Sequence, residues 1–175
     1  GLMYLEANRF ISVPHLLTPA LSSKSNFALG SGVLYATGTA GVTSVVPAAR
    51  RSEDIRYFLG VLNSSMLSAY ATLHSPVYQG GYRKFSSPYL KGLPMPEIDF
   101  DDDGQCALHR RIVQSVDVLT EIIPRASMSG VSADKRMLER QVKAGQHSLD
   151  EAVFDLFGVD KLERSAVIEH TKTVD

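Results

Sequence analysis

The sequence has few of the features that would place a protein in a membrane or in an oxidising compartment. Its single cysteine, Cys106, excludes a disulfide within the chain and favours a reducing compartment, so we expect a cytoplasmic protein. No apolar run approaches the roughly 18 residues that a membrane span requires. Residues 1–6 lack the charged and apolar segments of a secretory signal and resemble a remnant of cloning.

Complete sets of catalytic or metal-binding residues are also missing. The sequence has no Gly-x-Ser-x-Gly elbow of a serine hydrolase. The acidic run "DFDDDG" lacks the spacing of a calcium loop, and Cys106 with His109 makes only half of a metal site. The five histidines are scattered along the chain, at positions 15, 74, 109, 147 and 170. We therefore predict no catalytic residue, no metal ligand and no cofactor site in this chain.

Two stretches imitate catalytic motifs without completing them. "SSPY", at residues 86–89, is close to the Asn/Asp-Pro-Pro-Tyr/Phe signature of enzymes that methylate amino groups on DNA bases. Ser86 and Ser87 replace the Asn or Asp and the first proline, so a hydroxyl stands where a carboxamide or carboxylate oxygen would accept a hydrogen bond from the target amino group. "LGSGVLYATGTAG" is glycine-rich, but a strand-like run follows it where a ligand-binding loop needs a helix.

The charges divide the chain into two halves. Residues 1–91 carry eight basic and three acidic residues, a net charge of +5, whereas residues 92–175 carry ten basic and sixteen acidic residues, a net charge of −6. Such asymmetry favours two parts with different partners, although an uneven distribution by chance remains the alternative. The acidic, glycine-ended stretch "PEIDFDDDGQ" is typical of a linker. We place the boundary there, near residue 100.

The first half is predicted to combine short strands with one long helix. "RFISVPHLL" and "GVLYATGTAGVTSVV" are rich in β-formers and turns, and Pro14 indicates an edge strand or a strand end. Residues 52–74 place apolar side chains at three- and four-residue steps, which predicts an amphipathic helix. Ser52 is expected to cap this helix, with Glu53 and Asp54 in its first turn.

The second half is predicted to be helical. Leu108, Ile112, Val116, Leu119 and Ile123 form a narrow apolar stripe like a coiled-coil seam, which Pro124 is expected to end. A polar helix is expected over 134–144 and to end at Gly145. A third helix is expected to begin at Ser148 and to be capped by Gly158, and a short charged helix to follow over 161–170. The predicted fold class is α+β: a strand-rich lobe with one long helix, followed by a helical region.

The residues around "GGYRK" have the character of a nucleic-acid-binding loop. Arginine and lysine bind phosphates, glutamine and arginine read bases, and tyrosines stack or donate hydrogen bonds. Glycines allow the backbone to approach a groove closely. The expected DNA contacts are Tyr82, Arg83 and Lys84, then Arg50, Arg51, Gln79 and Lys91, with Gly80 and Gly81 shaping the loop. The competing interpretation is a basic surface loop with packed tyrosines.

Three segments resemble one family in their order along the chain. A helix with "FLGVLNSSMLSAYATL", a loop with "GGYR" and an ending with "YLKGLPMP" are similar to the TaqI-like C-terminal specificity domain of amino-adenine DNA methyltransferases and fused type II restriction–modification enzymes. "SLDEAVFDLFGVDKLERSAV" resembles the closing helix of that family. The matching positions are Leu62, Asn63, Ser64, Gly80 to Arg83, Tyr89, Leu90, Leu93, Pro94, Met95 and Pro96.

The resemblance implies a DNA target-recognition domain over residues 5–98 and a helical region over 105–172. In such proteins an upstream domain carries the methyl-transfer motifs and binds S-adenosylmethionine, so we expect this chain to be non-catalytic. Its partners would be duplex DNA and that upstream domain of the same protein. One alternative is a protein-interaction module, in which the 108–123 stripe pairs with a partner helix, as in a dimer or in the spacer helices of specificity subunits. A free-standing enzyme has little support from the sequence.

Overall fold

The computed structural model describes residues 13–30, 41–48, 50–130 and 132–174, and within them the protein is α+β, as predicted. Five short strands precede or interrupt a series of helices: β1 (Leu16–Pro19), β2 (Leu21–Ser22), β3 (Ala28–Leu29), β4 (Val42–Val45) and β5 (Arg83–Lys84). The helices are α2 (Ile55–Leu62), α3 (Ser65–His74), the 3-10 turn η1 (Gln79–Gly81), α4 (Ser87–Leu90), α5 (Asp103–Met128), α6 (Ser132–Phe157) and α7 (Lys161–Val174).

The strands form two small antiparallel sheets. In the first, β1 lies between β3 and β4, so that Leu16 pairs with Leu29 on one side and with Val45 on the other. This strand begins beyond Pro14, in agreement with a proline at a strand end. The second sheet pairs β2 with β5. Of the predicted strand run at 32–46, only the end from residue 41 lies within the described residues, and it contains β4.

The predicted single helix over 52–74 is wrong, because the chain forms two helices there. α2 ends at Leu62 and α3 starts at Ser65. The Asn63 side chain accepts a hydrogen bond from the Phe27 backbone N–H and donates one to the Phe27 carbonyl, both at 2.8 Å. Ser64 then caps α3 by accepting from the backbone N–H of Leu67. Polar side chains that prefer caps over helix interiors therefore divide an otherwise continuous apolar pattern.

The predicted start of that helix is also corrected. Asp54, not Ser52, caps α2, and its carboxylate accepts from the backbone N–H of Arg56 at 2.9 Å. Glu53 precedes the helix instead of lying in its first turn. Its carboxylate turns back to accept hydrogen bonds from Arg51 and from the backbone N–H of Ile98.

The C-terminal helices run through two residues that were expected to end them. Pro124 lies inside α5, which continues to Met128. A proline removes one intrahelical hydrogen bond, but α5 continues for four residues beyond it. Gly145 lies inside α6, which is continuous where two helices were expected. A Cβ at position 145 would lie 3.0 Å from Cδ2 of Leu119, so this glycine allows α5 and α6 to approach closely.

Two helix ends in this region have clear capping. Gly158 has a φ of 66° and follows α6 as predicted, while the N–H of Val159 donates to the carbonyl of Phe154 at 3.0 Å, closing the helix. Asp160 caps α7 by accepting from the backbone N–H of Glu163, and the Glu163 carboxylate accepts from the N–H of Asp160 in return. This reciprocal pair is a capping box, and α7 extends to Val174, beyond its predicted end.

One buried cluster joins the two halves of the chain. Leu16, Tyr57 and Leu67 from the first half share it with Ile112, Leu149 and Val153 from the second. Within the 108–123 stripe, Ile112, Val116 and Leu119 are buried in this core, whereas Ile123 is 46% exposed. The stripe is therefore largely covered by the chain itself. The division into domains at residue 100 stays a prediction.

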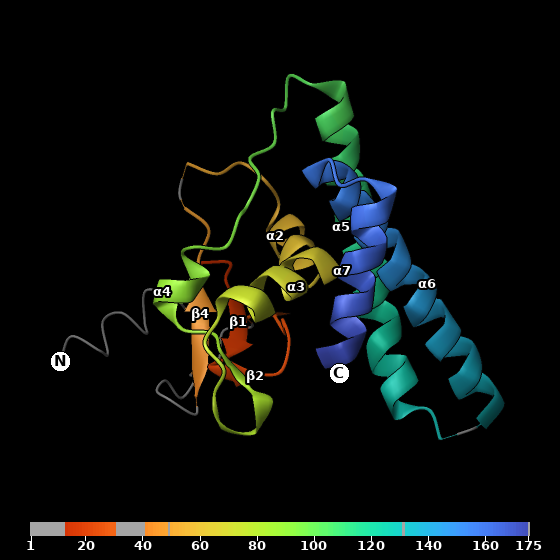
Figure 1. Cartoon of the computed structure of the whole chain (residues 1–175). Helices are drawn as coiled ribbons and strands as arrows, with labels where there is room; N and C mark the ends of the chain where they lie inside the picture. Colours follow the sequence, from red (N-terminus) through yellow and green to blue (C-terminus); the bar gives the residue numbers. More distant parts are fainter. Residues whose placement is uncertain (1–12, 31–40, 49, 131, 175) are drawn as a thin grey trace.

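The strands and the C-terminal helices lie on opposite sides of the molecule. In Figure 1, α5 and α6 pack side by side, α7 packs against α3, and α2 and α3 lie between the long helices and the strands. The loop that contains η1 projects at the lower edge of this view. None of the helices in the described part of the chain is both long and apolar enough to cross a membrane.

Candidate nucleic-acid interface

The residues from Val77 to Lys84 form a hairpin, which we call the Gly-Gly hairpin. Val77 makes an antiparallel bridge with Arg83, and the N–H of Tyr78 donates to the carbonyl of Tyr82 at 2.6 Å. Gly80 and Gly81 form the tip, with φ values of 78° and 81°. Residues with a side chain rarely adopt this left-handed conformation, so the two glycines are required for the turn.

The base of the hairpin is anchored in the core through Phe85. This side chain is 1% exposed and meets Phe27 edge-on, with ring centroids 6.2 Å apart. Its N–H donates to the carbonyl of Ala20, and its carbonyl accepts from the hydroxyl of Thr43, each at 2.9 Å. Pairing of β5 with β2 adds to this anchor. The tip is thus presented from a fixed base.

The hairpin presents two aromatic side chains to solvent. Tyr78 and Tyr82, which flank the tip, are 48% and 50% exposed. An exposed tyrosine offers a flat apolar face together with a hydroxyl that donates and accepts hydrogen bonds. These two rings, with the open backbone at the glycines, form a surface suited to stacking on, or hydrogen bonding to, a flat polar partner such as a base.

The two basic residues of β5 differ in their surroundings. Arg83 donates from Nη1 to the carbonyl of Ser75, at the end of α3, at 3.0 Å. Its Nε is buried and has no hydrogen-bond partner within the described residues. Arg83 therefore ties the hairpin to α3, while Lys84 is half-buried and in no ion pair in the part of the chain described. Lys84 is the freer cation of the pair.

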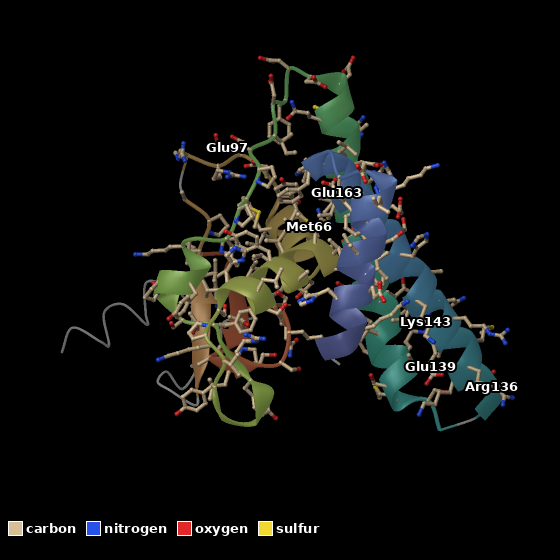
Figure 2. The ribbon with its side chains drawn as sticks, viewed as in Figure 1. Met66, Glu97, Arg136, Glu139, Lys143 and Glu163 are labelled. Atoms are coloured by element: carbon tan, nitrogen blue, oxygen red, sulfur yellow. The ribbon has the colours of Figure 1, made fainter. Side chains whose placement is uncertain are left out.

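The other expected contact residues lie elsewhere. Arg50 is exposed and pairs with Glu97 at 3.2 Å. Figure 2 shows Glu97 in the upper part of the molecule, whereas the hairpin projects at the lower edge in Figure 1. Lys91 is exposed at the end of α4. The backbone of Gln79 belongs to η1, but its side chain lies outside the described residues.

Arg51 is held inside the protein. Its side chain is 10% exposed and pairs with Glu53 at 2.6 Å, and its Nη2 donates to the carbonyl of Pro96 at 2.6 Å. Burial raises the pKa of Glu53, but hydrogen bonds from Arg51 and from the N–H of Ile98 outweigh burial, so that the pKa lies below its usual value. This ion pair fixes the segment that leaves the strand-rich lobe. Its position leaves Arg51 little access to a ligand.

A second ionic cluster, formed by Asp54 and Arg56, lies at the start of α2 next to the Arg51–Glu53 pair. The hydrogen bond from Arg56, followed by a backbone N–H and the charge of the same residue, lowers the pKa of Asp54 to about 2 despite partial burial. His109 accepts from the N–H of Asp54 at 3.3 Å, and burial lowers the pKa of that histidine. A neutral imidazole is what this acceptor role requires. The cluster joins α2 to α5.

A cleft of about 750 Å³ separates residues 24–29 from α5. Two of its polar residues are engaged within the chain: Asn63 with Phe27, and Ser65 with the carboxylate of Asp150 at 2.7 and 2.8 Å. The hydroxyl of Ser25 in its lining is buried and has no hydrogen-bond partner among the described residues. No nucleophile in it is hydrogen-bonded to a histidine among the contacts of the described residues, and these residues include no group of three His, Cys, Asp or Glu that could hold a metal.

Comparison with known proteins relates this chain to restriction–modification enzymes. It is 25% identical over 126 residues, 72% of its length, to the type II restriction enzyme and methyltransferase RM.Eco57I of Escherichia coli. The chain is similar to part of a restriction–modification enzyme. It spans only 12% of the length of that relative. No protein-family model matches the sequence.

The hairpin residues were predicted from sequence because they are adjacent in it. The roles of Phe85 as the anchor and of Ser75 as the partner of Arg83 were not predicted from the sequence. The sequence does contain a signal for the anchor. Successive side chains of a strand face opposite sides, so an aromatic residue that directly follows Lys84 can face the core while Lys84 faces the other side. A backbone carbonyl partner eight residues away has no sequence signal.

Proposed function

We propose that this chain is a non-catalytic target-recognition part of a restriction–modification adenine DNA methyltransferase, and that it binds duplex DNA through the Gly-Gly hairpin. The observation that carries the proposal is the hairpin itself: two exposed tyrosines at a glycine tip, next to a half-buried lysine, on an anchored base. A two-stranded ribbon of this kind fits the major groove of B-DNA.

Each predicted contact residue takes a role that fits its surroundings. Tyr82 and Tyr78 face the bases, and Lys84 binds a phosphate. Arg83 orients the hairpin through Ser75 and supports the surface electrostatically. Arg50 and Lys91, both exposed, supply peripheral phosphate contacts. Arg51 positions the segment that leaves the lobe rather than touching DNA.

The similarity to RM.Eco57I supports the same class of function. That relative is named as a restriction enzyme and methyltransferase, and most of its length has no counterpart in this chain. Methyl transfer, with S-adenosylmethionine as the donor, is accordingly assigned to an upstream domain of the parent protein. This chain would deliver the target adenine to that domain by gripping the surrounding duplex.

The test is DNA binding by the chain and by the variant Tyr82→Ala/Lys84→Gln. A random-sequence duplex library first selects the preferred site, and fluorescence anisotropy then measures Kd at salt concentrations between about 50 and 200 mM. We expect the variant to bind the selected duplex at least about tenfold more weakly and to discriminate less against unselected duplex. Loss of one phosphate contact should reduce the salt slope by about 0.9.

The matched control is Tyr89→Ala/Lys161→Gln. It removes one exposed tyrosine and one exposed lysine outside the hairpin, on α4 and α7. The control should retain both Kd and salt slope. Equal Kd values and slopes for the hairpin variant and the unmodified chain would contradict the hairpin assignment, and a lack of binding by the unmodified chain at low salt would overturn the proposed function.

A further inference from the structure

We propose that α6 carries a second contact surface for the backbone of the same duplex, formed by Arg136, Arg140 and Lys143. We call these three residues the basic stripe. This inference rests on the proposed function, because it assigns another part of the chain to the DNA that the Gly-Gly hairpin binds. It concerns a helix in the acidic half of the chain, where sequence composition gave no indication of nucleic-acid binding.

Helical geometry places the stripe on the outward side of α6. At 100° per residue, Arg140 and Lys143 lie within about 40° of Arg136, whereas Leu138 and Gly145 point to the opposite side. Leu138 is 7% exposed, and a Cβ at Gly145 would contact Leu119 of α5. The side that packs against α5 is therefore fixed, and the three cations face solvent, in agreement with their exposure.

The three stripe residues lie on one face of α6 without an ion pair among the described residues, whereas three arginines elsewhere in the helical region are paired. Arg111 binds Asp155 at 3.0 Å, Arg164 binds Glu151 at 2.6 Å, and Arg125 binds Glu121 at 3.3 Å. Within the described part of the chain, none of the three stripe residues has a carboxylate within ion-pairing distance. Glu139 lies on α6 between Arg136 and Lys143, as Figure 2 shows, but makes no ion pair with them among the described residues, so the three cations stay open to an anionic ligand.

A shallow hollow runs beside the stripe. Ala133 and Ala144 contribute small side chains to it, Arg136 and Arg140 border it, and its volume is about 490 Å³. The exposed large apolar side chain in its lining is Met137, at 55%. A phosphate backbone needs cations and room, and the stripe with the hollow beside it offers both. The row of cations along one helix face favours the backbone of a duplex, and an acidic protein is the competing partner.

A ligand that contacts both the stripe and the hairpin has to extend along the lower edge of the molecule. In Figure 1 the hairpin and the end of α6 next to α5 both reach the lower edge of the molecule, on either side of the C-terminal end of α7. Figure 2 shows Arg136 and Lys143 on α6, on the side of the molecule away from the strands. From Arg136 to Lys143 the helix rises about 10 Å. That length matches about three phosphates of one strand, at about 3.4 Å of duplex axis each.

The experiment compares Arg136→Gln/Arg140→Gln with Arg110→Gln/Lys161→Gln in the whole 175-residue chain. Both variants lose two exposed positive charges from helices, but the second pair lies outside the basic stripe. Anisotropy with the selected duplex at several salt concentrations gives Kd and slope. We expect the stripe variant to reduce the slope by about 1.8 and to bind roughly tenfold to a hundredfold more weakly at about 100 mM salt. The control variant should change neither the salt slope nor the Kd by a comparable amount.

Two further measurements test whether the stripe binds a phosphate backbone. Arg136→Lys/Arg140→Lys keeps both charges, so it should retain the salt slope if the partner is a phosphate backbone. The discrimination between selected and unselected duplex should stay intact in the stripe variant, because phosphate contacts carry no direct sequence information. Unchanged circular dichroism of each variant confirms that exposed substitutions leave the fold intact.

The results separate this inference from the proposed function. Equal slopes for the stripe variant and the unmodified chain, with weakened binding by the hairpin variant, would overturn the basic stripe and leave the proposed function standing. Binding of an acidic protein domain with unchanged DNA affinity in the stripe variant would also overturn it. A chain that binds no duplex at all would remove the proposed function itself.

Discussion

Gly60 lies where α2 crosses α5, and its lack of a side chain sets how closely the two helices pack. A Cβ at this position would lie 2.7 Å from Cγ2 of Ile112 and 2.9 Å from Cγ2 of Val116. Both neighbours are β-branched and buried, so neither can turn away without strain. We predict that Gly60→Ala destabilises the chain by about 1–2 kcal/mol, because overpacking exceeds the gain in helix propensity. Urea unfolding followed by circular dichroism measures this change.

Gly130→Ala is the control for this prediction. Nothing lies within 4 Å of a Cβ added at Gly130, which stands between α5 and α6. Its free energy of unfolding should stay within about 0.5 kcal/mol of the unmodified chain. A Gly60→Ala variant as stable as this control would show that α2 and α5 do not pack as described.

The candidate site was predictable from sequence only where its residues are neighbours in sequence. Tyr82, Arg83 and Lys84 share a hairpin because the two glycines before them demand a tight turn. Arg51 was grouped with them by charge alone. Its partner, the carbonyl of Pro96, lies 45 residues away and becomes visible only when the chain is folded.

Among the helices, α3 and α6 are joined by a buried carboxylate. Asp150 on α6 is 6% exposed and accepts hydrogen bonds from the backbone N–H and the hydroxyl of Ser65, at 2.7 and 2.8 Å. It thereby satisfies the first turn of α3, whose N–H groups have no partner within that helix. We predict that Asp150→Ala destabilises the chain by about 2 kcal/mol, because both groups of Ser65 are left unpaired. Asp150→Asn, which keeps an acceptor, should cost less than about 1 kcal/mol.

The difference in stability between the unmodified chain and Asp150→Asn should depend on pH. Burial raises the pKa of Asp150, and the hydrogen bonds from Ser65 and Gln146 offset only part of that rise. A carboxyl whose pKa is higher in the folded state binds a proton more tightly there, so its contribution to stability is present at low pH and is lost as pH rises through the folded pKa. The stability of the unmodified chain relative to Asp150→Asn should therefore increase as pH falls from neutral towards the ordinary aspartate pKa. Urea unfolding of both proteins over this range measures the difference, and a constant or decreasing difference would contradict it.

The helices were predicted more reliably than their ends. Periodic apolar residues identified the helical segments in both halves, and Gly158 was correctly expected to cap α6. Pro124 and Gly145 were taken as breaks because each disfavours an isolated helix. In the folded chain α6 packs closely against Leu119 and Ile122 of α5 at Gly145, and tertiary packing there overrides local propensity. Asn63 had the opposite effect, since its bonds to Phe27 end a helix that the apolar pattern continued.

In the whole molecule, the shared core bears on the predicted division at residue 100. The composition change there indicated two domains, yet Leu59 and Gly60 of α2 are covered by residues of α5 and α6. Loss of the helical region would expose this side of α2 and remove the carboxylate that satisfies the start of α3. The charge asymmetry therefore describes the surfaces of the two halves, whereas their shared apolar core indicates that they fold as one unit.

We therefore predict that a fragment of residues 1–100 does not fold on its own. The whole chain should unfold in urea in one cooperative transition, with coincident midpoints by circular dichroism and by tyrosine fluorescence. The fragment should show no such transition, because its share of the core is too incomplete to offset the entropy of ordering the chain. Adding a separate fragment of residues 101–175 should restore the transition, since the α2–α5 contact and the Asp150–Ser65 link need no covalent connection between the halves. A cooperative transition in the first fragment alone, with duplex binding equal to that of the whole chain, would instead establish an independent recognition domain and would leave the basic stripe of α6 without a part in binding.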